Sequence, residues 1–139
     1  MATKNSKKKT KKLIIDQYDP QIYPRLLWCC KNAKLSDLQK RFVLRDKKEI
    51  DESWHPQEGV YTLYVEEIST KKYGCLVNFP DYVFKDKDNF INVITHEAEH
   101  VKNSIFYDIH LDGGIEADEA DAYLVGWIAQ CIYNTMIKK

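Results

Sequence analysis

Residues 93–104 read VITHEAEHVKNS, and this stretch decides the fold because it lies inside a long helical pattern. Asp88 precedes the pattern as a candidate N-cap, and Gly113-Gly114 follows it. We therefore predict a long helix that begins at about residue 88 and buries one face. The apolar residues at helical spacing are Phe90, Ile91, Ile94, Ala98, Val101 and Ile105.

His96, Glu97 and His100 form the pattern H-E-x-x-H on this predicted helix. Residues four apart on a helix lie one above the other, so both imidazoles could bind one Zn²⁺ ion. The metal would lower the pKa of a bound water, and the Glu97 carboxylate could accept its proton. We predict His96 and His100 as zinc ligands and Glu97 as general base, with polar surface residues as the alternative.

A catalytic zinc site also requires a third protein ligand. The extended pattern of the metzincins is absent, since Asn103 holds its glycine position and Phe106 its third histidine position. A carboxylate from the following helix, Glu116 or Glu119, fits better than His110. The residues alone do not decide which of these three side chains is the third ligand.

The flanking segments predict a small α+β domain. Residues 22–30 have the composition of a buried strand, and residues 35–44 that of a short helix capped by Ser36. Residues 60–66 and 73–79 are rich in β-formers and predict an antiparallel hairpin.

Residues 116–136 predict a second long helix with acids in its first turn. Its predicted buried stripe consists of Leu124, Ile128, Cys131 and Ile132. We expect a short, mainly antiparallel sheet packed against the H-E-x-x-H helix and a C-terminal helix.

Four stretches occur in an order that resembles known proteins: YPRLLW at residues 23–28, YGCLVNFP at 73–80, THEAEH at 95–100 and EADAYLVGW at 119–127. They resemble short proteins of phages and prophages. The motif followed by an acid-bearing helix is similar to zincins of the gluzincin kind, including the ImmA/IrrE-type metallopeptidases. The resemblance implies a zincin-like fold and Glu119 as the third ligand. Tyr123 would donate a hydrogen bond to the oxyanion of the reaction, with a core tyrosine as the alternative.

Charge divides the chain into two parts. Residues 1–12 hold six lysines and no acid, whereas the remainder has 15 basic and 21 acidic side chains. We predict a disordered lysine-rich tail over residues 1–12 and a single domain over residues 13–139. The tail could contact nucleic acid, or it could serve only as a solubilising tail.

Cysteine usage and hydropathy predict a cytoplasmic protein, in a bacterial host if the chain is phage-encoded. The four cysteines lack metal-ligand spacing, and we expect reduced packing groups. No apolar run is long enough for a membrane span or a secretory signal.

The leading hypothesis is a small zinc metallopeptidase with one zinc ion per chain and a protein or peptide substrate. The alternative is a non-catalytic, zincin-like module that binds metal or another protein. A third hypothesis is a phage protein whose lysine-rich tail binds DNA or an acidic partner.

Overall fold

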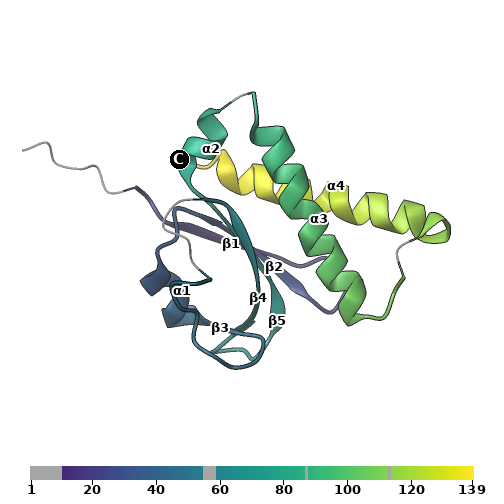
Figure 1. Ribbon diagram of the computed structural model, residues 1–139, viewed down its shortest axis with the longest axis horizontal. Helices are drawn as coiled ribbons and strands as arrows, with labels where there is room; N and C mark the ends of the chain where they lie inside the picture. The colour runs from purple at the N-terminus through teal and green to yellow at the C-terminus, as the bar shows by residue number, and fades with distance from the viewer. Residues whose placement is uncertain (1–10, 55–58, 87, 113) are drawn as a thin grey trace, which may run out of the picture.

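The computed structural model describes residues 11–54, 59–86, 88–112 and 114–139. The described chain forms one curved sheet with helices against both faces (Figure 1), which confirms the predicted α+β class. The elements in chain order are β1 (Ile14–Tyr18), β2 (Leu26–Lys31), α1 (Leu35–Arg41), β3 (Phe42–Leu44), β4 (Tyr61–Glu67), β5 (Tyr73–Phe79), α2 (Asp81–Lys85), α3 (Phe90–Asp108), the 3-10 helix η1 (Ile115–Ala117) and α4 (Asp118–Met136).

The sheet has five strands in the order β1-β2-β5-β4-β3. The β2–β5 pair is parallel, and the other three pairs are antiparallel, including the predicted hairpin of β4 and β5. Gly74 lies opposite Leu26 in the parallel pair, where a Cβ atom would meet the Leu26 carbonyl oxygen at 2.1 Å. A glycine at this position is therefore required for β2 and β5 to approach each other.

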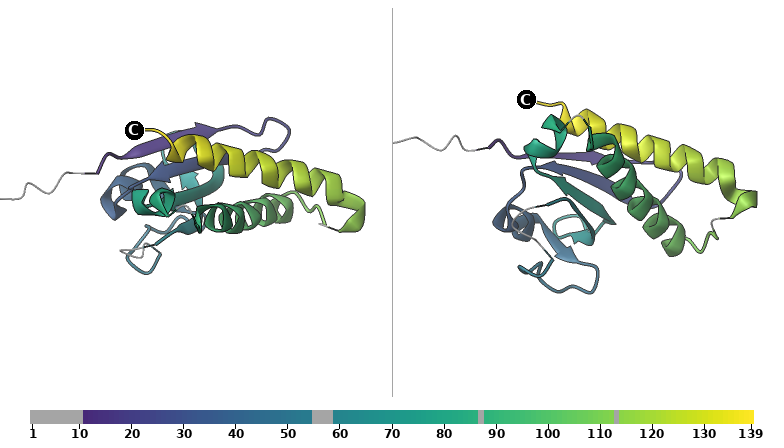
Figure 2. Two further views of the ribbon diagram at one scale, coloured as in Figure 1. Left: turned by 90° about the horizontal axis from the view of Figure 1, so that it is seen from above. Right: turned by 45° about the horizontal axis from the view of Figure 1, so that its top comes forward.

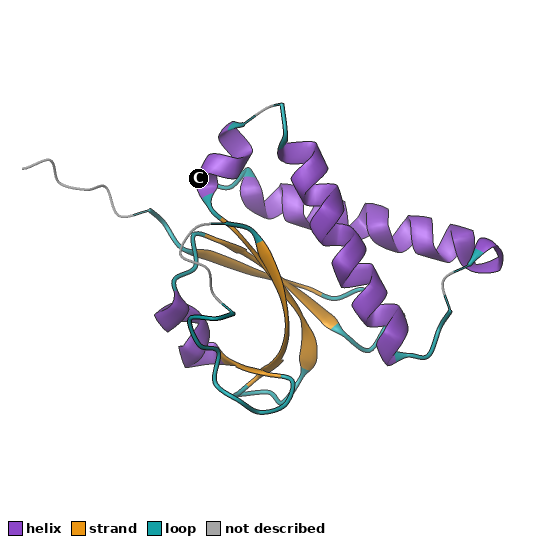
Figure 3. Cartoon of the chain, viewed as in Figure 1, coloured by secondary structure: helices purple, strands orange, loops and turns teal. Residues whose placement is uncertain are grey.

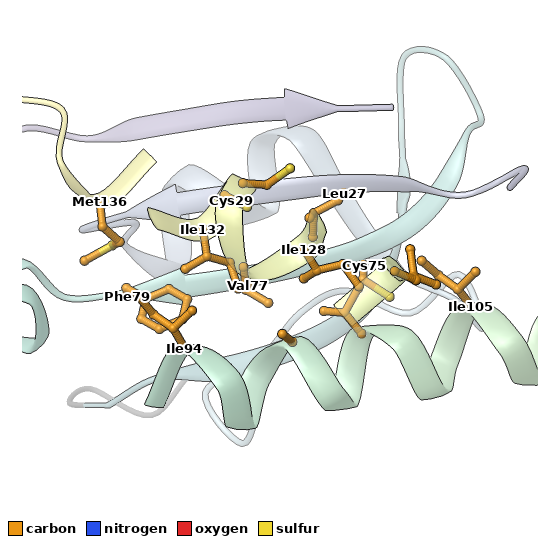
Figure 4. Packing of buried hydrophobic residues seen from close by; sticks show 14 of the residues in the cluster. Leu27, Cys29, Cys75, Val77, Phe79, Ile94, Ile105, Ile128, Ile132 and Met136 are labelled. Atoms are coloured by element: carbon orange, nitrogen blue, oxygen red, sulfur yellow. The ribbon is translucent and has the colours of Figure 1, made fainter. Parts of the chain in front are cut away.

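Alternating side chains of the strands supply two separate cores, as the two-residue period of a strand dictates. Leu27, Cys29 and Val77 face α3 and α4, and Figure 4 shows them against Ile94, Ile128 and other apolar side chains of the two helices. Leu26, Trp28 and Leu76 face the opposite side, where α1 contributes Leu38. The predicted stripe of α4, with Leu124, Ile128, Cys131 and Ile132, is buried.

The two long helices cross on one face of the sheet (Figure 3). The second half of α4 lies over the strands, whereas its first turns extend past them, as both views of Figure 2 show. Among the described residues, no helix combines the length and apolarity that a membrane span requires.

All four cysteines are buried and unbridged, as predicted. Burial raises the pKa of the Cys75 and Cys131 thiols to about 12. These thiols are therefore protonated packing groups.

Several local predictions are wrong. Helix α3 begins at Phe90 after an N-cap at Asn89 rather than Asp88, and Ile91 is exposed. Helix α1 has Lys34 at its N-cap instead of Ser36, and it ends at Arg41 because residues 42–44 pair with β4 as strand β3. The strand predicted over residues 22–30 begins only at Leu26, and β1 and α2 were not predicted.

The predicted lysine-rich tail lies outside the described residues except for its last two. Lys11 forms an ion pair with Asp81 at 3.2 Å, and the Lys12 ammonium donates a hydrogen bond to the Lys139 carbonyl at 3.1 Å. These contacts hold residues 11 and 12 beside the domain.

Candidate functional site

Helix α3 presents His96 and His100 side by side on its exposed face. Their Nε2 atoms lie 3.1 Å apart, and the ring centroids are 4.8 Å apart in an edge-to-face arrangement. The spacing of four residues produces this contact, because it places side chains on the same face one turn apart. Both side chains are exposed to solvent.

Glu97 points in a different direction from the two histidines. Its side chain is buried, with 6% exposure, and its Oε2 atom accepts a hydrogen bond from the Thr62 hydroxyl on β4. A carboxylate that is buried with a hydrogen-bond partner is satisfied as part of the packing between a helix and a sheet. The observed contact therefore gives Glu97 a structural role between α3 and β4.

The buried ammonium of Lys102 shows on which side of α3 the helix α4 lies. This group binds the Asp121 carboxylate of α4 at 2.9 Å and the Glu99 carboxylate at 2.8 Å. The pKa of Lys102 is raised: burial alone would lower it, but the hydrogen bonds to Glu99 and Asp121 outweigh burial. The Lys102 side of α3 is thus the side on which α4 begins.

The predicted third ligand does not join the histidines. At about 100° per residue, His100 lies about 160° around α3 from Lys102, so it faces away from α4. By the same geometry, Glu119 lies about 160° around α4 from Asp121 and faces away from α3. Tyr123, which is four residues after Glu119, shares that outward face.

The other two candidates for the third ligand are also outside the pair. Glu116 lies exposed in η1, and His110 follows α3 as an exposed residue with a left-handed φ of 57°. Within the ranges that the structure describes, no three His, Cys, Asp or Glu side chains are grouped so that they could hold a metal ion. The predicted zinc-dependent peptidase is therefore wrong for this structure, because two imidazoles without a third protein donor do not make a catalytic zinc site.

A different feature lies on the outward face of α4. The loop between β1 and β2 and the first turns of α4 line an open hollow of about 430 Å³, which we call the apolar hollow. Ile22 on the loop is 82% exposed, and Tyr123 on the helix is 75% exposed. The lining residues are Pro20, Ile22, Tyr23, Ala120, Tyr123, Leu124 and Trp127.

Helical spacing explains why these residues gather. Ala120, Tyr123, Leu124 and Trp127 follow one another at intervals of three or one, so they form a stripe on α4. Leu124 is buried against the core, whereas Tyr123 stands outside it. Trp127 meets the ring of Tyr18 on β1 edge-on, with centroids 6.5 Å apart.

Acids lie at one end of the apolar hollow, where α4 begins, although the residues that line the hollow are uncharged. Residues 111–127 contain five acids and no lysine or arginine. Glu119 lies one turn before Tyr123 on the same face of α4, and it forms no ion pair within the described part of the chain. The hollow therefore combines exposed aromatic surface with negative charge at the end where α4 begins.

Sequence reasoning missed this hollow because it assigned Tyr123 either to zinc chemistry or to the core. The width of the apolar surface on α4 could have indicated that part of this surface is exposed. Tyr123, Leu124, Trp127 and Ile128 together cover a wider arc than one core-facing stripe needs. The opposing loop could not have been placed from sequence, since it belongs to a strand pair that was not predicted.

Comparison of the chain with protein-family models, with curated proteins and with solved structures gives no match.

Proposed function

We propose that this protein is a protein-binding module whose docking surface is the apolar hollow. The observation that carries the proposal is the exposure of Ile22 and Tyr123 around one concave, mainly apolar surface. Large exposed apolar side chains grouped in this way are typical of interaction sites, and tyrosine and tryptophan are the residues that most often dominate binding energy.

The negative charge of Glu119 beside the hollow indicates that the partner carries basic residues. An aromatic or leucine side chain of the partner would enter the hollow, and lysine or arginine beside it would meet Glu119. Lysine and arginine also suit the aromatic wall, because their apolar stems pack on rings and their cations interact with the ring faces. The proposed ligand is therefore a protein segment with a large apolar side chain flanked by basic residues.

The zincin-like relationship, the phage origin and the nucleic-acid contact of the tail stay predictions. An α+β domain with two long helices on one face of its sheet is compatible with a zincin-like scaffold. A scaffold of that kind can serve binding without catalysis, since fold does not determine function.

Selection of short random peptides displayed on phage against the immobilised protein tests the proposal. We expect enrichment of sequences that place Phe, Trp or Leu beside Lys or Arg. Tyr123→Ala should weaken binding of a selected peptide by about tenfold or more, because an aromatic residue at the centre of a contact contributes about 2 kcal/mol.

Tyr107→Ala is the matched control, because Tyr107 is 79% exposed but does not line the apolar hollow. Its affinity for the selected peptide should equal that of the wild type. Peptides that bind equally well to the Tyr123→Ala protein would refute the proposed docking surface.

A further inference from the structure

A second hollow adjoins the apolar hollow on the other side of the loop between β1 and β2. Its volume is about 390 Å³, and Tyr23 lines both hollows. We call it the basic hollow, because Arg25, Lys71 and Lys72 line it together with Tyr73, with Asp19 as its acid. The two hollows are therefore neighbours on one surface, separated by the loop.

The cations of the basic hollow differ in how they are held. Arg25 donates a hydrogen bond from Nε to the Asp108 carboxylate at 2.8 Å, and its guanidinium lies 5.8 Å from the centre of the Tyr73 ring. Lys71 and Lys72 are exposed in the turn before β5. Within the described residues neither of these two ammonium groups forms an ion pair, so both charges face solvent.

The apolar hollow and the acids beside it could supply binding partners for these two lysines. Its aromatic wall can hold the apolar stem of a lysine, and Glu119 at its outer end can accept the ammonium. Glu116 in η1 is a second exposed acid without an ion pair in the part of the chain that the structure describes. The acids beside the apolar hollow and the lysines of the basic hollow are thus complementary in charge.

We propose that a second copy of this chain binds at the apolar hollow; this inference rests on the proposed function, and Lys71 and Lys72 of the copy supply the basic residues of the proposed ligand. A two-fold axis near the loop between β1 and β2 places the apolar hollow of each copy over the basic hollow of the other. In such an interface the same surface serves both copies, and each contact occurs twice. Lys71 and Lys72 of one copy lie over Tyr123 and beside Glu119 of the other.

Sedimentation equilibrium of the full chain tests the inference. We expect a reversible dimer whose dissociation constant rises with salt, because exposed charge pairs are screened. The double variant Lys71→Glu/Lys72→Glu should raise the dissociation constant by about tenfold or more, because it places like charges together across the interface.

The most direct test reverses the charges on both sides of the proposed interface and asks whether dimerisation is restored. Adding Glu116→Lys and Glu119→Lys to the Lys71→Glu/Lys72→Glu protein should return the dissociation constant to near the wild-type value. The control Lys40→Glu/Lys48→Glu, which makes the same change of charge outside both hollows, should leave the constant unchanged.

The outcomes separate this inference from the proposed function. A chain that is monomeric at every concentration, but binds selected peptides through Tyr123, overturns the second copy as partner and leaves the docking surface intact. A dimer that persists in the Lys71→Glu/Lys72→Glu protein, or dissociates only when residues 1–12 are removed, also overturns the inference.

Discussion

Both halves of α4 carry apolar side chains, but the surroundings of these side chains differ. Ile128, Ile132 and Met136 in the second half are fully buried against the sheet and α3. Tyr123 in the first half faces solvent beside the exposed Ile22 of the loop between β1 and β2. The comparison teaches that apolar residues on one helix can stabilise the fold at one end and form a recognition surface at the other.

The largest difference between the buried half of α4 and the loop that faces its exposed half should appear in stability. Ile128→Ala removes a fully buried side chain and should lower the free energy of unfolding by about 2–5 kcal/mol. Ile22→Ala, at an exposed position, should lower it by less than about 0.5 kcal/mol. Urea unfolding followed by tryptophan fluorescence measures both, and similar losses for the two variants would contradict the division.

The attachment of the C-terminal end of α3 to Arg25 and Arg45 should depend on pH through Asp108. Burial alone would raise the pKa of this carboxyl, but the hydrogen bonds from Arg45 and Arg25 hold it below its ordinary value. Asp108→Asn should lower the free energy of unfolding at neutral pH by about 1–3 kcal/mol, because charge-assisted hydrogen bonds are lost.

The pH at which this difference disappears follows from the lowered pKa. The stabilisation by ionised Asp108 is fully present above the unfolded pKa of about 3.9 and is lost as the pH falls through the lower folded pKa. The wild type and the Asp108→Asn protein should therefore converge in stability only in strong acid. A constant difference across the whole pH range would show that the charge of Asp108 does not matter.

A substitution in the apolar hollow should weaken binding without lowering stability. Tyr123→Ala should change the free energy of unfolding by less than about 0.5 kcal/mol, since the ring is mostly exposed. Urea unfolding of this variant beside Tyr107→Ala measures the effect. A loss of several kcal/mol in Tyr123→Ala alone would mean that Tyr123 belongs to the core rather than to a docking surface.

The smallest effect is expected at His96 and His100. Excess EDTA should change the free energy of unfolding by less than about 0.5 kcal/mol, whereas loss of a structural zinc ion would cost roughly 10 kcal/mol. Urea unfolding with and without the chelator measures this difference. A large destabilisation that is absent in His96→Ala would restore the metal hypothesis.

Elements with a strong period were predictable, and those that depend on distant partners were not. The hairpin of β4 and β5 and the buried stripe of α4 follow from local patterns and are confirmed. Residues 42–44 continue a helical pattern, yet they form β3 because β4 offers hydrogen-bond partners. This is a case in which tertiary contacts override local propensity.

The candidate site divides in the same way. The contact between His96 and His100 follows from helical spacing alone. Whether Glu119 can join them depends on the side of α3 against which α4 packs, and no local pattern specifies that side. The ion pair between Lys102 and Asp121 marks that side, and only the folded structure reveals it.

Peptide affinity measured on three proteins tests the central claim that the first half of α4, and not the histidine pair, carries the function. A peptide selected on the wild type is titrated by fluorescence anisotropy against the wild type, Tyr123→Ala and His96→Ala/His100→Ala. We expect about tenfold weaker binding or worse for Tyr123→Ala and wild-type affinity for the double histidine variant. Loss of binding in the histidine variant with full binding in Tyr123→Ala would contradict the account.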